Sequence, residues 1–193
     1  MTIPNLITIG RLVVVPLTIW LIVVGEHATA FWIFVIAGVS DGVDGFLARQ
    51  FNMRSDLGAY LDAIADKTLL VSIFITCAVL GQIPVWLTIL VASRDFLIVG
   101  GVVLAWMLGQ PIELKPRMIS KVNTVVQIGL VGFVLADNAF NIDLFDIREL
   151  LVILTGLLTI GSAAVYVNDW VRHMSGADAA AATPTVPPRE DRA

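Results

Sequence analysis

Four aspartates lie in an otherwise apolar part of the chain, and their type and spacing suggest a reaction centre. They are Asp41, Asp44, Asp62 and Asp66. A carboxylate inside a membrane-spanning segment costs about 2.5 to 3.5 kcal/mol on insertion scales, so four of them require cationic partners. Carboxylate oxygens favour hard cations such as Mg²⁺, Mn²⁺ or Ca²⁺ over zinc. The sequence therefore predicts that these side chains bind a pair of divalent cations.

The separation within each aspartate pair predicts that its members share one face of a helix. The first two aspartates are three residues apart and the last two are four apart, and residues at these separations are neighbours on a helix surface. If one helix ends at Arg49 and the next begins near Leu57, both pairs lie roughly 8 to 13 Å from the same membrane surface. An antiparallel hairpin of the two helices would bring all four carboxylates to one level.

Composition indicates that membrane-spanning helices position these residues. The chain is 58% hydrophobic and 15% charged, whereas about 25% of residues are charged in soluble domains. Six apolar windows are long enough to cross a bilayer, at residues 8–25, 29–49, 57–80, 84–108, 120–137 and 147–171. We predict an all-α integral membrane protein with six transmembrane helices and a short N-terminal interfacial helix over residues 2–9. One membrane domain covers residues 1–174, and residues 175–193 form a disordered tail rich in Ala, Pro and Thr.

Positive charges predict the orientation, because Lys and Arg accumulate on the cytoplasmic side. They occur beside the second and fourth connections and after the last window: Arg49, Arg54, Lys115, Arg117, Lys121, Arg172, Arg189 and Arg192. The other connections contain only Arg148. We predict a multi-pass protein with both termini and the active site in the cytoplasm, in the inner or plasma membrane if the source is bacterial. No basic patch alternates with aromatic residues, so no nucleic-acid partner is expected.

A cleaved signal peptide ending at Ala30 is the alternative for the first window. It is disfavoured because Pro16 interrupts the apolar stretch and Arg11 alone is a poor positive region.

Small residues accompany the aspartates. Gly42, Gly45, Ala48 and Gly58 would leave the helix surface bare enough for a nucleotide to approach the backbone. Arg49 could bind a phosphate oxygen through its guanidinium group. A seam of small residues for helix packing explains the glycines equally well.

The complete pattern resembles the signature of the CDP-alcohol phosphotransferase family. It reads Asp41-xx-Asp44-Gly45-xx-Ala48-Arg49, eight residues, then Gly58-xxx-Asp62-xxx-Asp66. The resemblance implies that the four aspartates hold two divalent cations, Mg²⁺ or Mn²⁺, against the pyrophosphate of CDP-diacylglycerol. It also implies that Gly45, Ala48, Arg49 and Gly58 bind the CDP-lipid. By the same resemblance Asp66 takes the proton from the acceptor hydroxyl, CMP leaves, and the protein forms a homodimer.

Further segments resemble the branch of this family that contains phosphatidylglycerophosphate synthases and CMP-forming cardiolipin synthases. They are Ile3–Arg11, Ser93-Arg94-Asp95 and Leu114–Gln127. The second and third of them favour phosphatidylglycerol as the acceptor, with glycerol-3-phosphate as the alternative. Ala63 departs from the branch pattern, which usually has proline there.

Both acceptors carry a phosphate, so basic residues are candidates for binding them. These candidates are Arg94, Lys115, Arg117 and Lys121. For Lys115 and Arg117, anchoring at the cytoplasmic interface is an equally good explanation. Arg94 lies mid-window beside Asp95, which predicts that it faces the interior. A cation transporter is the alternative from another class, because intramembrane carboxylates also mark ion paths.

Overall fold

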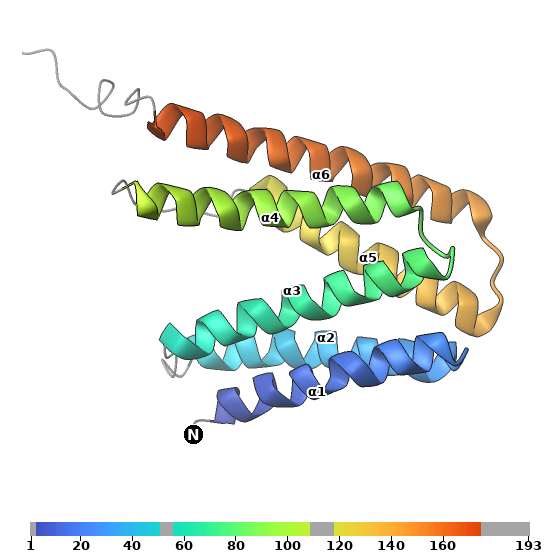
Figure 1. Cartoon of the computed structure of the whole chain (residues 1–193). Helices are drawn as coiled ribbons and strands as arrows, with labels where there is room; N and C mark the ends of the chain where they lie inside the picture. The colour runs from blue at the N-terminus through green and yellow to red at the C-terminus, as the bar shows by residue number, and fades with distance from the viewer. Residues whose placement is uncertain (1–2, 51–55, 109–117, 175–193) are drawn as a thin grey trace, which may run out of the picture.

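The computed structural model describes the backbone of residues 3–50, 56–108 and 118–174, and the side chains of residues 10, 13–40, 67–105, 107–108 and 118–172. Every regular element within these ranges is an α-helix (Figure 1). The helices are α1 (Ile3–Val23), α2 (His27–Gln50), α3 (Asp56–Val79), α4 (Val85–Met107), α5 (Met118–Phe140) and α6 (Phe145–Met174). The all-α prediction is confirmed, and each helix overlaps one of the six apolar windows.

The structure corrects the prediction of a separate short helix over residues 2–9. Helix α1 runs without a break from Ile3 to Val23, and Pro16 lies inside it. Pro4 lies in the first turn, where a missing backbone N–H costs nothing because that group has no partner within the helix. The interfacial stretch is therefore the beginning of the first long helix.

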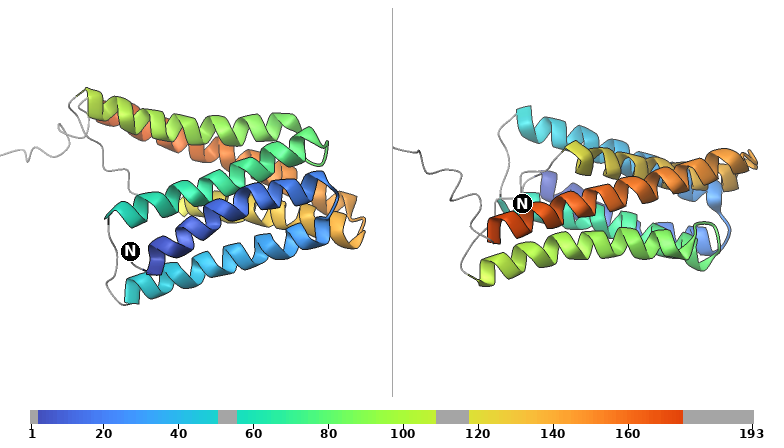
Figure 2. Two further views of the ribbon diagram at one scale, coloured as in Figure 1. Left: turned by 60° about the horizontal axis from the view of Figure 1, so that its bottom comes forward. Right: turned by 90° about the horizontal axis from the view of Figure 1, so that it is seen from above.

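The six helices form a closed ring of neighbours in the order α1, α2, α5, α6, α4 and α3. Helix α3 also packs against α5 across this ring. Among the contacts of the described residues, α2 and α3 do not pack on each other. Instead α1 and α5 each contact both of them. The carboxyl end of α2 and the amino end of α3 nevertheless lie at the same end of the bundle (Figure 2).

Two of the helix connections depend on glycine. Gly25 after α1 has a φ of 85°, and Gly81 after α3 has a φ of 72°, a left-handed conformation that glycine adopts without strain. The N–H of Glu26 donates to the carbonyl of Leu21 at 2.9 Å, which closes a Schellman turn at the end of α1. The equivalent bond after α3 is 2.7 Å long. These turns reverse the chain at the end of the bundle away from the aspartates.

The apolar core lies in the half of the bundle next to these turns. Its buried members include Val15, Ile22, Phe34, Ile73, Phe74, Leu87, Val91, Leu130, Val134 and Val152. Buried charged and amide side chains lie outside this core, toward the end that carries the aspartates: Arg94, Asn123 and Gln127. The bundle therefore has an apolar half and, toward the aspartates, a polar half, which we define by these three buried side chains.

Three of the described helices are long and apolar enough to cross a membrane. They are Val85–Ala105, Met118–Phe140 and Phe145–Arg172. The described apolar stretches of the first three helices are shorter, at Val13–Val23, His27–Ser40 and Lys67–Val79. Large hydrophobic side chains also cover the outside of the bundle, and Phe96 is 77% exposed. These features indicate a membrane protein.

Candidate functional site

The four aspartates lie on the two helices that flank α1 in the ring. Asp41 and Asp44 belong to α2, and Asp62 and Asp66 belong to α3. Because both stretches are helical, each pair shares one helix face. At a rise of about 1.5 Å per residue, Asp41 and Asp66 lie about 14 and 15 Å along their helices from the shared end. The backbone thus places both pairs at a similar level.

The side chains of the predicted metal and CDP-lipid residues lie outside the part of the structure that is described. They are Asp41, Asp44, Asp62, Asp66, Gly45, Ala48, Arg49 and Gly58. Lys115 and Arg117 lie outside the described residues altogether. Among the side chains that are described, no group of three or more His, Cys, Asp or Glu could hold a metal ion. Four carboxylates remain a donor set of the kind that Mg²⁺ and Mn²⁺ prefer.

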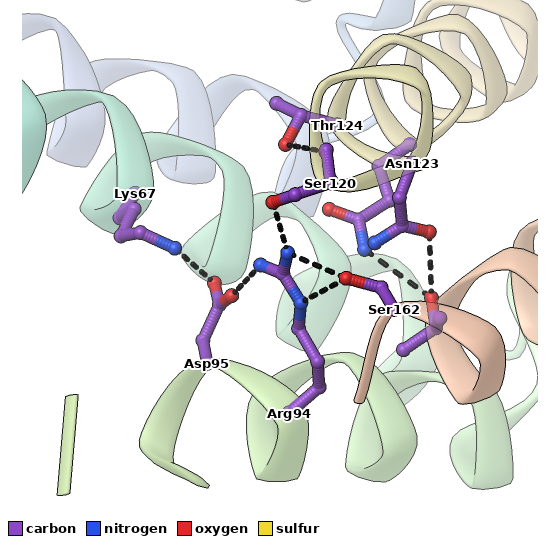
Figure 3. A network of polar contacts seen from close by, with 9 residues as sticks. Lys67, Arg94, Asp95, Ser120, Asn123, Thr124 and Ser162 are labelled. Atoms are coloured by element: carbon purple, nitrogen blue, oxygen red, sulfur yellow. Dashed lines mark hydrogen bonds and ion pairs between the residues drawn. The ribbon is translucent and has the colours of Figure 1, made fainter. Parts of the chain in front are cut away.

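A buried arginine joins three helices in the polar half of the bundle (Figure 3). Arg94 on α4 is 4% exposed. Its Nε and Nη2 donate to Oγ of Ser162 on α6 at 3.2 and 2.9 Å, and Nη2 also donates to Oγ of Ser120 on α5. Its Nη1 donates to Oδ1 of Asp95 at 2.6 Å, and the ring of Tyr166 lies 5.7 Å from its Cζ. The prediction that Arg94 faces the interior is confirmed.

These partners explain how a guanidinium group is accommodated there. A buried charge is costly unless it is paired and its hydrogen bonds are satisfied. Asp95 supplies the opposite charge, and the hydroxyl oxygens of Ser120 and Ser162 accept further hydrogen bonds from the guanidinium group. Arg94 therefore acts as a link between α4, α5 and α6.

Asp95 extends the network to a fourth helix. Its Oδ1 accepts from Arg94, while its Oδ2 lies 2.8 Å from Nζ of Lys67 on α3. The side chain of Asp95 is 16% exposed and that of Lys67 is 51% exposed. Since Lys67 directly follows Asp66, this ion pair holds α3 against α4 one residue from the predicted base. The sequence alone does not indicate this pairing, because Lys67 and Asp95 lie 28 residues apart.

A second polar cluster connects α5 and α6. Asn123 and Thr159 are fully buried and Gln127 is 2% exposed. Oγ1 of Thr159 donates to Oδ1 of Asn123 at 3.0 Å, and Nε2 of Gln127 donates to Oγ1 of Thr159 at 3.4 Å. Nδ2 of Asn123 is buried with no hydrogen-bond partner within the described structure. Nearby Lys121, one of the predicted acceptor-binding residues, is exposed in the first turn of α5.

An apolar cavity of about 300 Å³ lies between α4 and α6. Its lining residues are Leu97, Ile98, Gly101, Leu104, Tyr166, Val167, Trp170 and Val171. Nε1 of Trp170 donates to the carbonyl of Gly101 at 3.1 Å, so this indole has no donor left for an occupant. Tyr166 belongs both to this lining and to the surroundings of Arg94. The cavity thus adjoins the polar network, and its walls suit a hydrocarbon chain.

The chain is similar in sequence to known proteins. The family model for CDP-alcohol phosphatidyltransferase matches residues 1–165. The CMP-forming cardiolipin synthase of Homo sapiens is 34% identical over 181 residues, which cover 86% of this chain and 60% of the human protein. The chloroplastic CDP-diacylglycerol–glycerol-3-phosphate 3-phosphatidyltransferase 1 of Oryza sativa is 34% identical, over 86% of this chain and 56% of the rice protein.

A shorter match has higher identity. The probable phosphatidylglycerophosphate synthase of Mycobacterium tuberculosis is 38% identical over 97 residues, which cover 47% of this chain and 46% of that protein. The chain spans no more than 60% of the length of the human and rice relatives. The family model covers the aspartate signature together with Arg94 and Asp95, and leaves the cation-transporter alternative without support. The chain belongs to the CDP-alcohol phosphatidyltransferase family.

Proposed function

We propose that the protein transfers the phosphatidyl group of CDP-diacylglycerol to phosphatidylglycerol, forming cardiolipin and releasing CMP. The observation that carries this proposal is the complete aspartate signature on α2 and α3, at a similar level in a helical ring that belongs to this family. Glycerol-3-phosphate is the alternative acceptor, because both kinds of synthase occur among the relatives.

The donor substrate would bind at the end of the bundle that α2 and α3 share. Asp41, Asp44, Asp62 and Asp66 would hold two divalent cations, Mg²⁺ or Mn²⁺. When bound, these cations stabilise the charge that develops during an in-line displacement at phosphorus. Gly45, Ala48, Arg49 and Gly58 would bind the CDP portion. Small residues allow close approach, and the guanidinium group of Arg49 suits a phosphate oxygen.

The reaction requires one proton transfer from the acceptor. The carboxylate of Asp66 takes the proton of the acceptor hydroxyl, whose oxygen forms a bond to the phosphorus that bears diacylglycerol. The bond between this phosphorus and the oxygen of CMP breaks, and CMP leaves with the electron pair. Positioning and electrostatic stabilisation do most of the catalytic work in transfers of this type.

The apolar cavity between α4 and α6 favours a lipid acceptor over glycerol-3-phosphate. An acyl chain of phosphatidylglycerol would enter the cavity from the bilayer. Glycerol-3-phosphate has no hydrocarbon chain to pack against this apolar lining. Among the predicted acceptor-binding residues, Arg94 is buried and bonded to Asp95, Ser120 and Ser162, so we assign it an indirect role. Lys115, Arg117 and Lys121 are proposed to attract the anionic head group at the cytoplasmic surface.

We further propose that all six helices span the membrane, with both termini and the active site in the cytoplasm. Residues 1–174 then form one membrane domain and residues 175–193 a disordered tail. Cysteines introduced at Glu26 and Asn141 should react with an impermeant maleimide from outside intact cells, whereas a cysteine at Leu108 should react only after permeabilisation. The native Cys77 is fully buried and gives little background. Chemical cross-linking in the membrane tests the homodimer.

The acceptor is tested by supplying both candidates in parallel. Purified protein in liposomes receives radiolabelled CDP-diacylglycerol, Mg²⁺ and either phosphatidylglycerol or glycerol-3-phosphate, and the lipid product is identified. Cardiolipin is the expected product. Formation of phosphatidylglycerophosphate alone would overturn the lipid acceptor while leaving the reaction class intact.

A further inference from the structure

We propose that Lys67, held in place by Asp95, binds the phosphate group of the acceptor. This inference rests on the proposed function and adds a specificity residue to it. Lys67 directly follows the predicted base Asp66 on α3, and its Nζ lies 2.8 Å from Oδ2 of Asp95 on α4. Nothing in the aspartate signature itself assigns a role to either residue.

The ion pair does not use up the binding capacity of Lys67. An ammonium group carries three N–H donors, and one carboxylate oxygen engages one of them. Half of the Lys67 side chain is exposed, at 51%, whereas Asp95 is 16% exposed. The lysine is thus anchored at one side and accessible at the other, as a residue that receives a ligand must be.

The charges around Asp95 favour an anionic ligand. Asp95 is shared between Arg94 and Lys67, so these three groups together carry one net positive charge. Arg94 is unavailable to a ligand, because it is buried and bonded to Ser120 and Ser162. Lys67 is therefore the exposed cation of these three groups. The anionic group of either acceptor is its phosphate, so a phosphate oxygen is the expected ligand of Lys67.

The network also limits where the lysine can lie. Ser120 on α5 and Ser162 on α6 accept hydrogen bonds from Arg94. Arg94 donates in turn to the Asp95 carboxylate on α4, and this carboxylate pairs with Lys67 on α3 (Figure 3). A flexible four-carbon side chain is thereby ordered before the ligand arrives, which lowers the entropic cost of binding. Asp95 is accordingly a positioning residue that acts through Lys67.

Both candidate acceptors present the same chemistry to this site. In phosphatidylglycerol and in glycerol-3-phosphate, the attacking hydroxyl and the phosphate belong to one glycerol unit. A cation next to the base can hold the phosphate while the hydroxyl at the other end of the glycerol meets Asp66. The shared ligand is therefore a glycerol phosphate, free or esterified to diacylglycerol.

The test separates binding of the acceptor from binding of CDP-diacylglycerol. We expect Lys67→Met to raise KM for the acceptor about tenfold or more, with little change in KM for CDP-diacylglycerol. Lys67→Arg should restore part of the loss. Asp95→Asn should raise the same KM by a smaller factor. The double variant should be no worse than Lys67→Met alone, because Asp95 acts through the lysine.

A matched control breaks another ion pair between two helices. Asp137→Asn removes the partner of Arg148, with Nη1 to Oδ2 at 4.0 Å, at the opposite end of the bundle. It should leave both KM values unchanged. A Lys67→Met variant that raises only the KM for CDP-diacylglycerol, or lowers kcat with both KM values intact, overturns the inference. The inference is also overturned if the increases in acceptor KM caused by Lys67→Met and Asp95→Asn add in the double variant.

Equilibrium binding distinguishes failure of this inference from failure of the proposed function. Short-chain phosphatidylglycerol and glycerol-3-phosphate are titrated separately into purified wild type, Lys67→Met and Asp137→Asn. Weaker binding to Lys67→Met alone supports the inference even if the wild type releases no CMP. The ligand whose binding is weakened shows whether the bound phosphate belongs to phosphatidylglycerol or to glycerol-3-phosphate. Equal binding of both ligands to all three proteins overturns it even if cardiolipin is made.

Discussion

Arg94 and Ser162 lie 68 residues apart in sequence and are joined by two hydrogen bonds, from Nε and Nη2 of the arginine to the same Oγ, at 3.2 and 2.9 Å. This contact connects α4 to α6 in the polar half of the bundle. Through Asp95 and Lys67 it continues to α3, the helix that carries Asp62 and Asp66. This network of polar contacts thus holds α3, the helix on which the proposed chemistry depends, against the rest of the bundle.

Replacing Ser162 should weaken the fold. Ser162→Ala leaves two donors of a buried guanidinium group without their acceptor, which should cost about 1 to 3 kcal/mol. Thr124→Ala is the control, because its exposed hydroxyl donates to the carbonyl of Ser120 within the same helix, α5. It should cost less than about 0.5 kcal/mol. Unfolding in detergent, followed by circular dichroism, measures both, and equal stability of the two variants would contradict the role of this contact.

Replacing the proposed base should remove turnover and leave the protein folded. Asp66→Asn cannot accept a proton, and loss of a general base costs roughly 10²- to 10⁴-fold in rate. Asp146→Asn, at an exposed position in the first turn of α6, is the matched control and should retain full activity. CMP release is measured for both in the same liposomes. Near-normal turnover by Asp66→Asn would exclude this residue as the base.

Removing divalent cations should stop the reaction reversibly. Incubation with EDTA should abolish CMP release, and added Mg²⁺ or Mn²⁺ should restore it. Asp41→Asn should raise the cation concentration needed for half-maximal activity, because one carboxylate ligand is lost. Turnover that continues in EDTA would contradict the assignment of the four aspartates as metal ligands.

Filling the apolar cavity should discriminate between acceptors. Val167→Trp places a large ring among the residues that line it. We expect a higher KM for long-chain phosphatidylglycerol and no change for dihexanoyl phosphatidylglycerol. Ile153→Trp, on the exposed part of α6 away from the cavity, is the control. The same effect on both chain lengths would argue against an acyl chain in this cavity.

A pair of glycines tests the packing of the apolar half. A Cβ added at Gly156 would lie 3.0 Å from Cη2 of Trp86, whereas one added at Gly129 meets nothing within 4 Å. Gly156→Ala should therefore destabilise the protein by about 1 kcal/mol or more, because the indole must move. Gly129→Ala should be neutral or stabilising by up to about 1 kcal/mol, since alanine is the better helix former. Unfolding experiments that rank the two variants in the opposite order would contradict this packing.

The helices could be predicted from the sequence because a bilayer requires every backbone hydrogen bond to be made within the chain. An apolar stretch of sufficient length therefore identifies each helix, although the first helix also includes the segment predicted to be separate. The inward position of Arg94 could be predicted as well, because a charge in an apolar window has to find a partner.

The order of the helices could not be predicted in the same way. Hydropathy says which stretches cross the membrane, but side-chain packing decides which of them become neighbours. Hydropathy therefore does not predict that α1 lies between α2 and α3, or that Asp95 is the partner of Lys67. The contact between Asn123 and Thr159 spans 36 residues and carries no sequence signal of its own.

Release of CMP from CDP-diacylglycerol is the most direct test of the central claim. The purified wild type in liposomes with Mg²⁺ should release CMP when phosphatidylglycerol is present, with cardiolipin formed in equal amount. It should release none when both phosphatidylglycerol and glycerol-3-phosphate are left out. Absence of CMP release with either acceptor, from protein shown to be folded, would contradict the account.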